Sequence, residues 1–120
     1  MVKISSVEEY LSDKHPDGVG LFRAFQELVA ACGESQVDPH KTVVNWKDQR
    51  IFASAFILGK GLEIAIHLRR RVNHPTLRQA WNTTQKVVTH RLTIKKEDEL
   101  DEDIANWLCE ALATVGPGTR

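Results

Sequence analysis

The chain has 120 residues, of which 42% are apolar and 27% charged, and its acidic and basic side chains balance to no net charge. This composition is typical of one globular domain and argues against a disordered chain or a coiled coil. A domain of this size buries about two thirds of the surface of its unfolded chain, so it needs no crosslinks to fold. No stretch approaches the roughly 18 consecutive apolar residues of a membrane span, and the start, MVKISSVEEY, lacks the apolar core of a signal peptide. We therefore expect a cytoplasmic protein that makes no membrane contact.

The neutral total conceals three blocks of charge. Residues 1–40 hold three Lys or Arg against seven Asp or Glu, residues 41–96 hold twelve against two, and residues 97–120 hold one against seven. A basic middle block is typical of a surface that binds nucleic acid or another anion. Acidic helices packed against a basic sheet would give the same distribution, so an internal match of charges stays open.

Two helices are expected in the N-terminal third of the chain. The segment SSVEE has the pattern of a helix cap and predicts a short first helix. After the HPDG break, apolar residues recur at helical spacing as far as Gly33, which suits a helix stop. The residues of this second stripe are Leu21, Phe25, Leu28, Val29 and Cys32.

From Val37 onward the apolar period changes to about two, which indicates strands. The runs TVVNW, RIFASAFIL and LEIAIHLRRRV are separated by short turns and predict antiparallel hairpins. KVVTHRLTI predicts a further strand, whereas LRQAWN before it fits either a strand or a helical turn. The last segment, KKEDELDEDIANWLCEALATVG, has acidic first turns and a buried stripe, and it predicts a C-terminal helix.

These elements together predict the α+β class. We expect two N-terminal helices, an antiparallel meander sheet of four or five strands, and a C-terminal helix packed on the sheet. Residues 1–115 form the single domain in this interpretation, and residues 116–120, which begin with Gly-Pro-Gly, form a flexible C-terminal tail.

The order of these elements resembles the family catalogued as domain of unknown function 5655. The runs that carry the resemblance are TVVNWKDQRIFASAFIL, VVTHRLTI and the directly following KKEDELDEDIANWLCEA. The resemblance implies a small intracellular domain in which a threonine–histidine pair on a late strand precedes an acidic, Leu-Asp-containing start of the last helix. In this chain those positions are Thr89, His90, Leu100 and Asp101. The resemblance supports the fold and implies no reaction.

The candidate binding surface follows from strand alternation around IAIHLRRRVNH, residues 64–74. One face of this strand carries Leu62, Ile64, Ile66 and Leu68, and the other carries Glu63, Ala65, His67, Arg69 and Arg71. Arg70 falls on the apolar side after the apolar run has ended, so it marks where the strand leaves the core. If Phe52 and Phe56 of the preceding strand share the basic face, aromatic rings alternate with cations, as on surfaces that bind single-stranded nucleic acid.

His90 lies on the aliphatic side of its strand, with Val88, Leu92 and Ile94. A histidine there is either a hydrogen-bonded core residue or the wall of a pocket between sheet and helix, and the sequence leaves both open. Arg91 points to the opposite side.

Three tryptophans are the remaining contact candidates. Trp107 belongs to the stripe of the last helix, Trp46 closes a strand beside a turn, and Trp81 lies on the ambiguous segment. The candidate ligand- or partner-binding residues are His67, Arg69, Arg71, His90, Arg91 and Trp46.

Motifs for catalysis or cofactor binding are lacking. The chain has no glycine-rich phosphate loop, GxSxG elbow or HExxH pair. HPD at 15–17 and DPH at 38–40 each pair an imidazole with a carboxylate, which is too few ligands to predict a metal. Cys32 and Cys109 have neither CxxC nor CxxH spacing, so we expect two buried, reduced thiols and no cofactor.

We therefore expect a non-catalytic binding or interaction module for an anionic ligand or a protein partner. One alternative is a nucleic-acid-binding domain that uses the basic and aromatic sheet face. The other is a small enzyme with His90 in a pocket.

Overall fold

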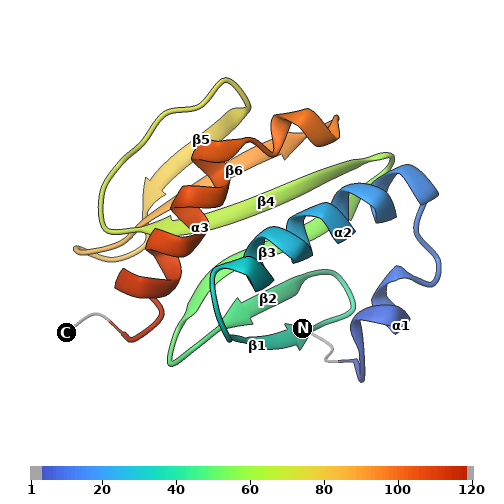
Figure 1. Ribbon diagram of the computed structural model, residues 1–120, viewed down its shortest axis with the longest axis horizontal. Helices are drawn as coiled ribbons and strands as arrows, with labels where there is room; N and C mark the ends of the chain where they lie inside the picture. The colour runs from blue at the N-terminus through green and yellow to red at the C-terminus, as the bar shows by residue number, and fades with distance from the viewer. Residues whose placement is uncertain (1–3, 119–120) are drawn as a thin grey trace.

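The computed structural model describes residues 4–118 and gives the predicted α+β class (Figure 1). The helices in this range are α1 (Val7–Leu11), α2 (Pro16–Ala31) and α3 (Glu102–Thr114), with a short 3-10 helix η1 (Glu97–Glu99) before α3. The strands are β1 (Gln36–Pro39), β2 (Val44–Lys47), β3 (Ile51–Leu58), β4 (Gly61–Leu68), β5 (Leu77–Asn82) and β6 (Val88–Ile94). None of these helices is both long enough and apolar enough to cross a membrane.

The strands form one antiparallel sheet in the order β1-β2-β3-β4-β6-β5, so it contains six strands rather than four or five. The additional strand is β1, a segment of four residues that ends in proline and shows no alternation of its own. LRQAWN is a strand, β5, but it lies on the outer edge because β4 pairs directly with β6. The sheet therefore departs from a simple meander at residues 69–76, which carry the chain past β6 to that edge.

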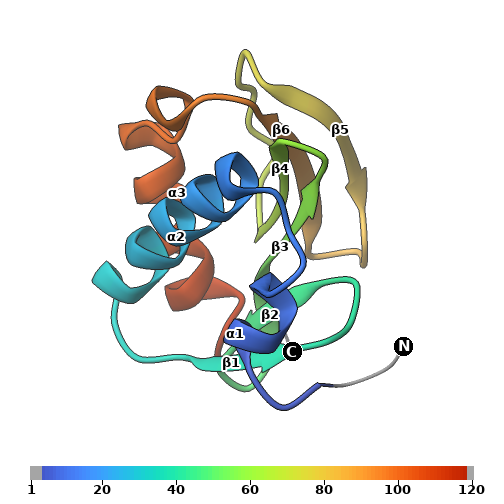
Figure 2. The same ribbon diagram turned by 90° about the vertical axis from the view of Figure 1, so that its right-hand side faces the viewer.

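Both long helices cover the same face of the sheet, as Figure 2 shows from the side. The strand residues that point to this face are aligned across the sheet: Ala53 opposes Ile66, which opposes His90, and Ala55 opposes Ile64 in the same way. The predicted alternation of Leu62, Ile64, Ile66 and Leu68 is confirmed, since each is at most 1% exposed. We call this side the covered face and the opposite side the helix-free face.

The helix ends follow the capping rules read from the sequence. The Ser6 hydroxyl accepts the Glu9 N–H at the start of α1, and an Asp101 carboxylate oxygen accepts the Ile104 N–H at the start of α3. Gly33 follows α2 at φ +132°, a backbone conformation that side chains disfavour, so the predicted stop at this glycine is confirmed.

The C-terminal end of the described chain docks on the sheet. The backbone carbonyl of Gly116 accepts hydrogen bonds from the N–H groups of Gln49 and Arg50, in the turn between β2 and β3. The residues 119 and 120 of the predicted flexible tail lie outside the described range.

The prediction of two reduced thiols is wrong. Cys32, at the end of α2, and Cys109, in α3, form a disulfide across 77 residues of sequence. Cys109 is exposed and Cys32 is half-buried, so neither is a core thiol. No short spacing motif links two cysteines that only the packing of α2 beside α3 brings together.

Candidate functional site

The helix-free face carries the polar and charged residues of the strands that form the core on their other side. Ser54, Ala65 and Arg91 are aligned across β3, β4 and β6, and the adjacent rows align Phe56 with Glu63 and Thr93, and His67 with Thr89. Arg78 and Trp81 of β5 extend this face at its edge, since Arg78 contacts Glu63 and Trp81 pairs with Thr89. The face is thus a continuous surface built from four strands.

Glu63 is the centre of this face. Its side chain is 2% exposed, yet it is one of the two acidic residues between residues 41 and 96. Arg91 donates to the Glu63 Oε1 atom from Nε at 3.0 Å, and Arg78 donates to the same oxygen from Nη1 at 3.3 Å. Two guanidinium groups therefore offset the desolvation of one carboxylate, which would be costly to bury unpaired.

Arg91 is held in position from a second direction. Its guanidinium lies over the ring of Phe56, 5.2 Å from the ring centroid. An arginine stacked on an aromatic ring and bonded through Nε keeps its terminal N–H groups oriented with little rotamer freedom. Such a group is prepared to bind an acceptor.

Two cavities adjoin Glu63. The smaller, about 160 Å³, is lined by Val43, Ser54, Phe56, Glu63, Ile64, Ala65 and Arg91. The larger, about 330 Å³, is lined by Leu58, Lys60, Gly61, Glu63, Thr93 and Lys95. Arg78 and Arg91 bond to Glu63. Lys60 and Lys95 line the larger cavity beside it. We call these five residues with Phe56 the Glu63 cluster.

His67 lies farther along the same face, beside Thr89. The Thr89 Oγ1 atom is 2.9 Å from His67 Nδ1 and also contacts the Thr83 hydroxyl. Burial, the positive charge of Arg50 and the nearby His90 together lower the pKa of His67 to about 4, and burial is the largest of these causes. His67 is therefore neutral at pH 7 and contributes a hydrogen-bonding group, not a charge, to this face.

The three arginines at positions 69–71 differ in the contacts that they make. Arg70 makes a bidentate pair with Glu110 of α3, at 2.9 and 3.0 Å, which confirms that it lies on the side where the helices pack. Arg71 donates to the backbone carbonyl of Ala80 and to the Asn82 side chain, so it fixes the loop to β5. Arg69 is exposed and forms no ion pair with a residue in the range 4–118. Two of the three arginines thus make contacts within the domain.

His90 lies on the covered face and is 1% exposed. Its Nε2 atom accepts the Val72 N–H at 3.0 Å, which leaves the proton on Nδ1, 3.3 Å from the Ile66 carbonyl. Burial lowers the pKa of His90 despite the favourable contact with that carbonyl. Of the two options the sequence leaves open, the structure gives the hydrogen-bonded core histidine.

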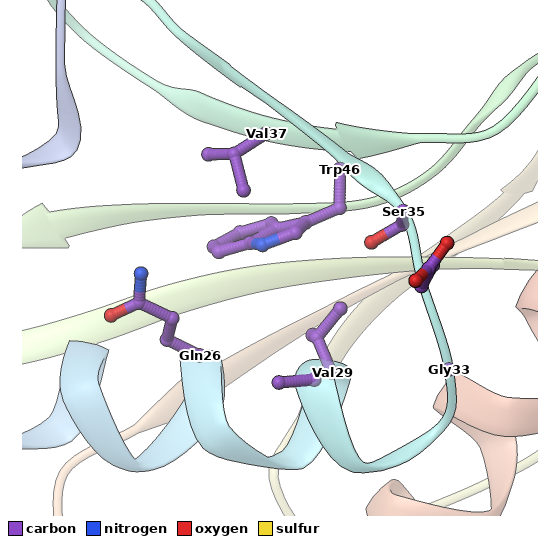
Figure 3. Close-up of a pocket in the computed structure, with 8 residues that line it drawn as sticks. Gln26, Val29, Gly33, Ser35, Val37 and Trp46 are labelled. Atoms are coloured by element: carbon purple, nitrogen blue, oxygen red, sulfur yellow. The ribbon is translucent and has the colours of Figure 1, made fainter.

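Trp46 also lies on the covered face, where its ring is 5.7 Å from Phe22 and 5.4 Å from Phe25 between centroids. It is 2% exposed, and what remains accessible faces a cleft of about 580 Å³ between the end of α2 and β1 (Figure 3). Trp46 is therefore remote from the helix-free face. Trp81, by contrast, is 38% exposed on that face.

Sequence reasoning missed a second buried histidine. The Nε2 atom of His74 lies 2.8 Å from the Asp101 carboxylate that caps α3, and Nδ1 accepts the Thr76 N–H at 3.1 Å. Its ring meets Trp107 edge to face at 5.8 Å. These contacts tie residues 69–76 to the last helix. The hydrogen bond from His74 keeps the pKa of Asp101 below its usual value, although partial burial opposes the shift.

Glu63 was also missed as a site residue, although the sequence contains a signal. A lone acidic residue within an alternating strand of a block with twelve cations predicts local pairing.

Of the imidazole–carboxylate pairs, His40 contacts Asp38 at 2.9 Å. The described residues contain no group of three or more His, Cys, Asp or Glu side chains able to hold a metal ion.

An antiparallel sheet with helices on one face and a charged cluster on the other defines a small α+β domain with an open sheet surface. The family model described as Domain of unknown function (DUF5655) matches residues 7–114, so the chain belongs to that family. The resemblance read from the sequence is thereby confirmed. In the same comparisons no curated protein and no solved structure matches the chain.

Proposed function

We propose that this domain is a non-catalytic binding module that takes an acidic segment of a protein partner at the Glu63 cluster. The observation that carries the proposal is the positive charge there: two arginines share one buried carboxylate, and two lysines line the larger of the two adjoining cavities. A partner carboxylate would enter next to Glu63 and meet cations that Glu63 alone does not neutralise.

The number of free N–H donors on the two arginines supports a carboxylate as the ligand group. Arg78 and Arg91 each direct one N–H to Glu63, and a guanidinium has five. The remaining donors of such a fork match the two oxygens of a carboxylate. Arg78 is 57% exposed and Arg91 32% exposed, so both are reachable from solvent while their positions are fixed by Glu63.

A binding role also agrees with the state of His90, the residue that an enzymatic role would need in a pocket. His90 is 1% exposed, and its two ring nitrogens contact the backbone of Val72 and of Ile66. A general acid or base needs an open hydrogen-bonding position toward a substrate. The proposal keeps the cytoplasmic location expected from the sequence.

One observation favours nucleic acid as a second candidate partner. Trp81 is exposed on the same face as the Glu63 cluster, and an exposed indole near arginines is a platform on which a base stacks. Against this, the whole chain has a pI of about 7.0, without the excess positive charge that is typical of domains binding nucleic acid.

The test is a fluorescence anisotropy titration of the protein with a labelled peptide of alternating Glu and Ser, and in parallel with a single-stranded oligonucleotide. Each is measured at about 50 and 150 mM salt, since charge-driven binding weakens as salt screens it. The site variant is Arg78→Gln, Lys95→Gln. The matched control, Arg23→Gln, Arg70→Gln, makes the same change in charge at exposed ion pairs elsewhere on the protein.

We expect the site variant to weaken peptide binding about tenfold, equivalent to about 1.4 kcal/mol, while the control changes it less than about twofold. Equal losses in both variants would mean that only net charge matters and would remove the Glu63 cluster from the proposal. If the protein bound the oligonucleotide preferentially and Trp81→Ala abolished this binding, the proposed partner would be nucleic acid and not an acidic segment. Absence of binding to either probe at low salt would overturn both.

A further inference from the structure

The Cys32–Cys109 disulfide joins an exposed residue to a half-buried one. Cys109 belongs to α3, with Leu108 and Ala111 buried toward the sheet, and is itself exposed. Cys32 caps the C-terminal end of α2 and is half-buried. Thiol–disulfide exchange needs access of a thiolate to one sulfur of the bond, and Cys109 is the more exposed of the two cysteines.

The fold has other means of holding the two helices that the bond joins. Helix α2 buries Leu21, Phe22, Phe25 and Val29, and α3 buries Ile104, Leu108 and Ala111. These residues belong to one core with the covered face of the sheet. Since a domain of this size can fold on its core alone, breaking the bond should leave the sheet and both helices in place.

The bond acts instead on the end of α2. Ala30 in the last turn, and Gly33, Glu34 and Ser35 directly after it, line the 580 Å³ cleft, with Cys32 between them in sequence. Figure 3 shows Val29 on the helix, Val37 and Trp46 across from it, and the segment from Gly33 to Ser35 leading from the helix toward Trp46. The disulfide is thus a covalent anchor, on α3, for the segment that forms one wall of the cleft.

We propose that Cys32–Cys109 is a reversible modification site for a low-molecular-weight thiol of the glutathione type, and that its opening releases this wall of the cleft. This inference is independent of the Glu63 cluster, which lies on the other face of the sheet.

The exchange proceeds in two balanced steps. A thiolate attacks the Cys109 Sγ atom, forms a mixed disulfide with it and expels the Cys32 thiolate, which takes up a proton. A second thiolate attacks the small-molecule sulfur of the mixed disulfide and expels the Cys109 thiolate, which is protonated in turn. In sum two thiols are oxidised to one small-molecule disulfide, and the protein disulfide is reduced to two thiols. The oxidised small molecule drives the reverse reaction.

The experiment compares three forms of the whole chain: oxidised, reduced and the variant Cys32→Ser, Cys109→Ser. Free thiols are counted by maleimide labelling and mass spectrometry after equilibration in glutathione buffers of graded redox potential. Hydrogen–deuterium exchange is followed in peptides that cover residues 28–37 and, as an internal control, in those from β4 and β6. Circular dichroism reports whether the fold persists.

We expect no labelling of the oxidised form, two labels after reduction, and return to none in oxidised glutathione. Amide exchange within residues 28–37 should rise about fivefold or more on reduction, with β4 and β6 unchanged, because only local opening becomes easier. The serine variant should match the reduced form. Free thiols in protein purified without reductant, loss of the fold on reduction, failure to reoxidise, or unchanged exchange in residues 28–37 would each overturn the proposal.

Discussion

The two faces of the sheet are built from the same strands and differ in nearly every property. On the covered face, Ala55 and Ile64 are aligned with Leu92, and all three are at most 1% exposed. Their sequence neighbours Phe56, Glu63 and Thr93 are aligned in the same way on the helix-free face. Because side chains alternate along a strand, one set of residues determines the core while the other is available for contacts.

The faces also differ in how they use buried polar groups. The covered face contains His90, which is neutral and bonded to the backbone, so it adds no charge to the core. The helix-free face contains Glu63, whose partners are themselves half-exposed side chains. A buried polar group bonded to backbone stabilises the fold, whereas one bonded to accessible cations holds those cations in fixed positions at the surface.

The largest expected effect is on the covered face. Ile66→Ala should lower the free energy of unfolding by about 3 kcal/mol, because it leaves a cavity at a residue that is 1% exposed in a central strand. Thr93→Ala on the helix-free face should cost less than about 1 kcal/mol. Urea denaturation monitored by circular dichroism measures both. Equal costs would mean that the two faces contribute alike to stability.

The next effect is a loss of stability in acid. The pKa of His67 falls from 6.5 to about 4 on folding, so between these values the unfolded chain binds a proton that the folded chain does not. The stabilisation is complete above pH 6.5 and is lost as the pH falls toward 4, by about 3 kcal/mol. The lowered pKa of His90 acts in the same direction.

Chemical denaturation at several pH values from 7.5 to about 4 tests this linkage. In His67→Gln the slope of stability against pH should be smaller over this range. A slope identical to that of the wild type would assign the acid sensitivity to other groups.

A smaller effect distinguishes buried from exposed carboxylates. Glu63→Gln should cost about 1.5 kcal/mol, since it removes the charge that Arg78 and Arg91 share at a site 2% exposed. Glu110→Gln, which removes the partner of the exposed Arg70, should cost less than about 0.5 kcal/mol. Thermal unfolding of the two variants side by side provides the comparison. A larger cost for Glu110 than for Glu63 would contradict the assignment of Glu63 as the centre of the helix-free face.

The smallest expected change concerns Trp81. Because it is 38% exposed at the edge of the sheet, Trp81→Ala should alter the free energy of unfolding by less than about 0.5 kcal/mol. Measured with the same urea denaturation, a cost above about 2 kcal/mol would show that Trp81 is part of the core.

Most of the fold was predicted from patterns of apolar and polar residues that lie close together in sequence. The alternation in β4 and the stripe of α2 are each set by residues close in sequence, and both are confirmed. The crossing of the chain from β4 to β5 was not predicted, because strand order depends on which edges meet and not on the strands themselves. Likewise, the pairing of Cys32 with Cys109 depends on the packing of two helices that are distant in sequence.

The candidate site was predicted only in part. His67 and Arg91 lie on the helix-free face as the alternation indicates, while His90 and Trp46 lie on the covered face. Phe52, expected to alternate with the cations, is fully buried where the register of β2 and β3 shifts. A register irregularity of this kind leaves no mark in a pattern of apolar and polar residues.

The contact of Arg71 with β5 bears on how molecules of this protein meet one another. An outermost strand offers unpaired carbonyl and N–H groups to any extended chain that approaches it, and sheets grow into aggregates by that route. Here the guanidinium of Arg71 donates to the Ala80 carbonyl and brings a positive charge to the rim. Two copies approaching through this rim would bring like charges together, so Arg71 favours a protein that stays dispersed at high concentration.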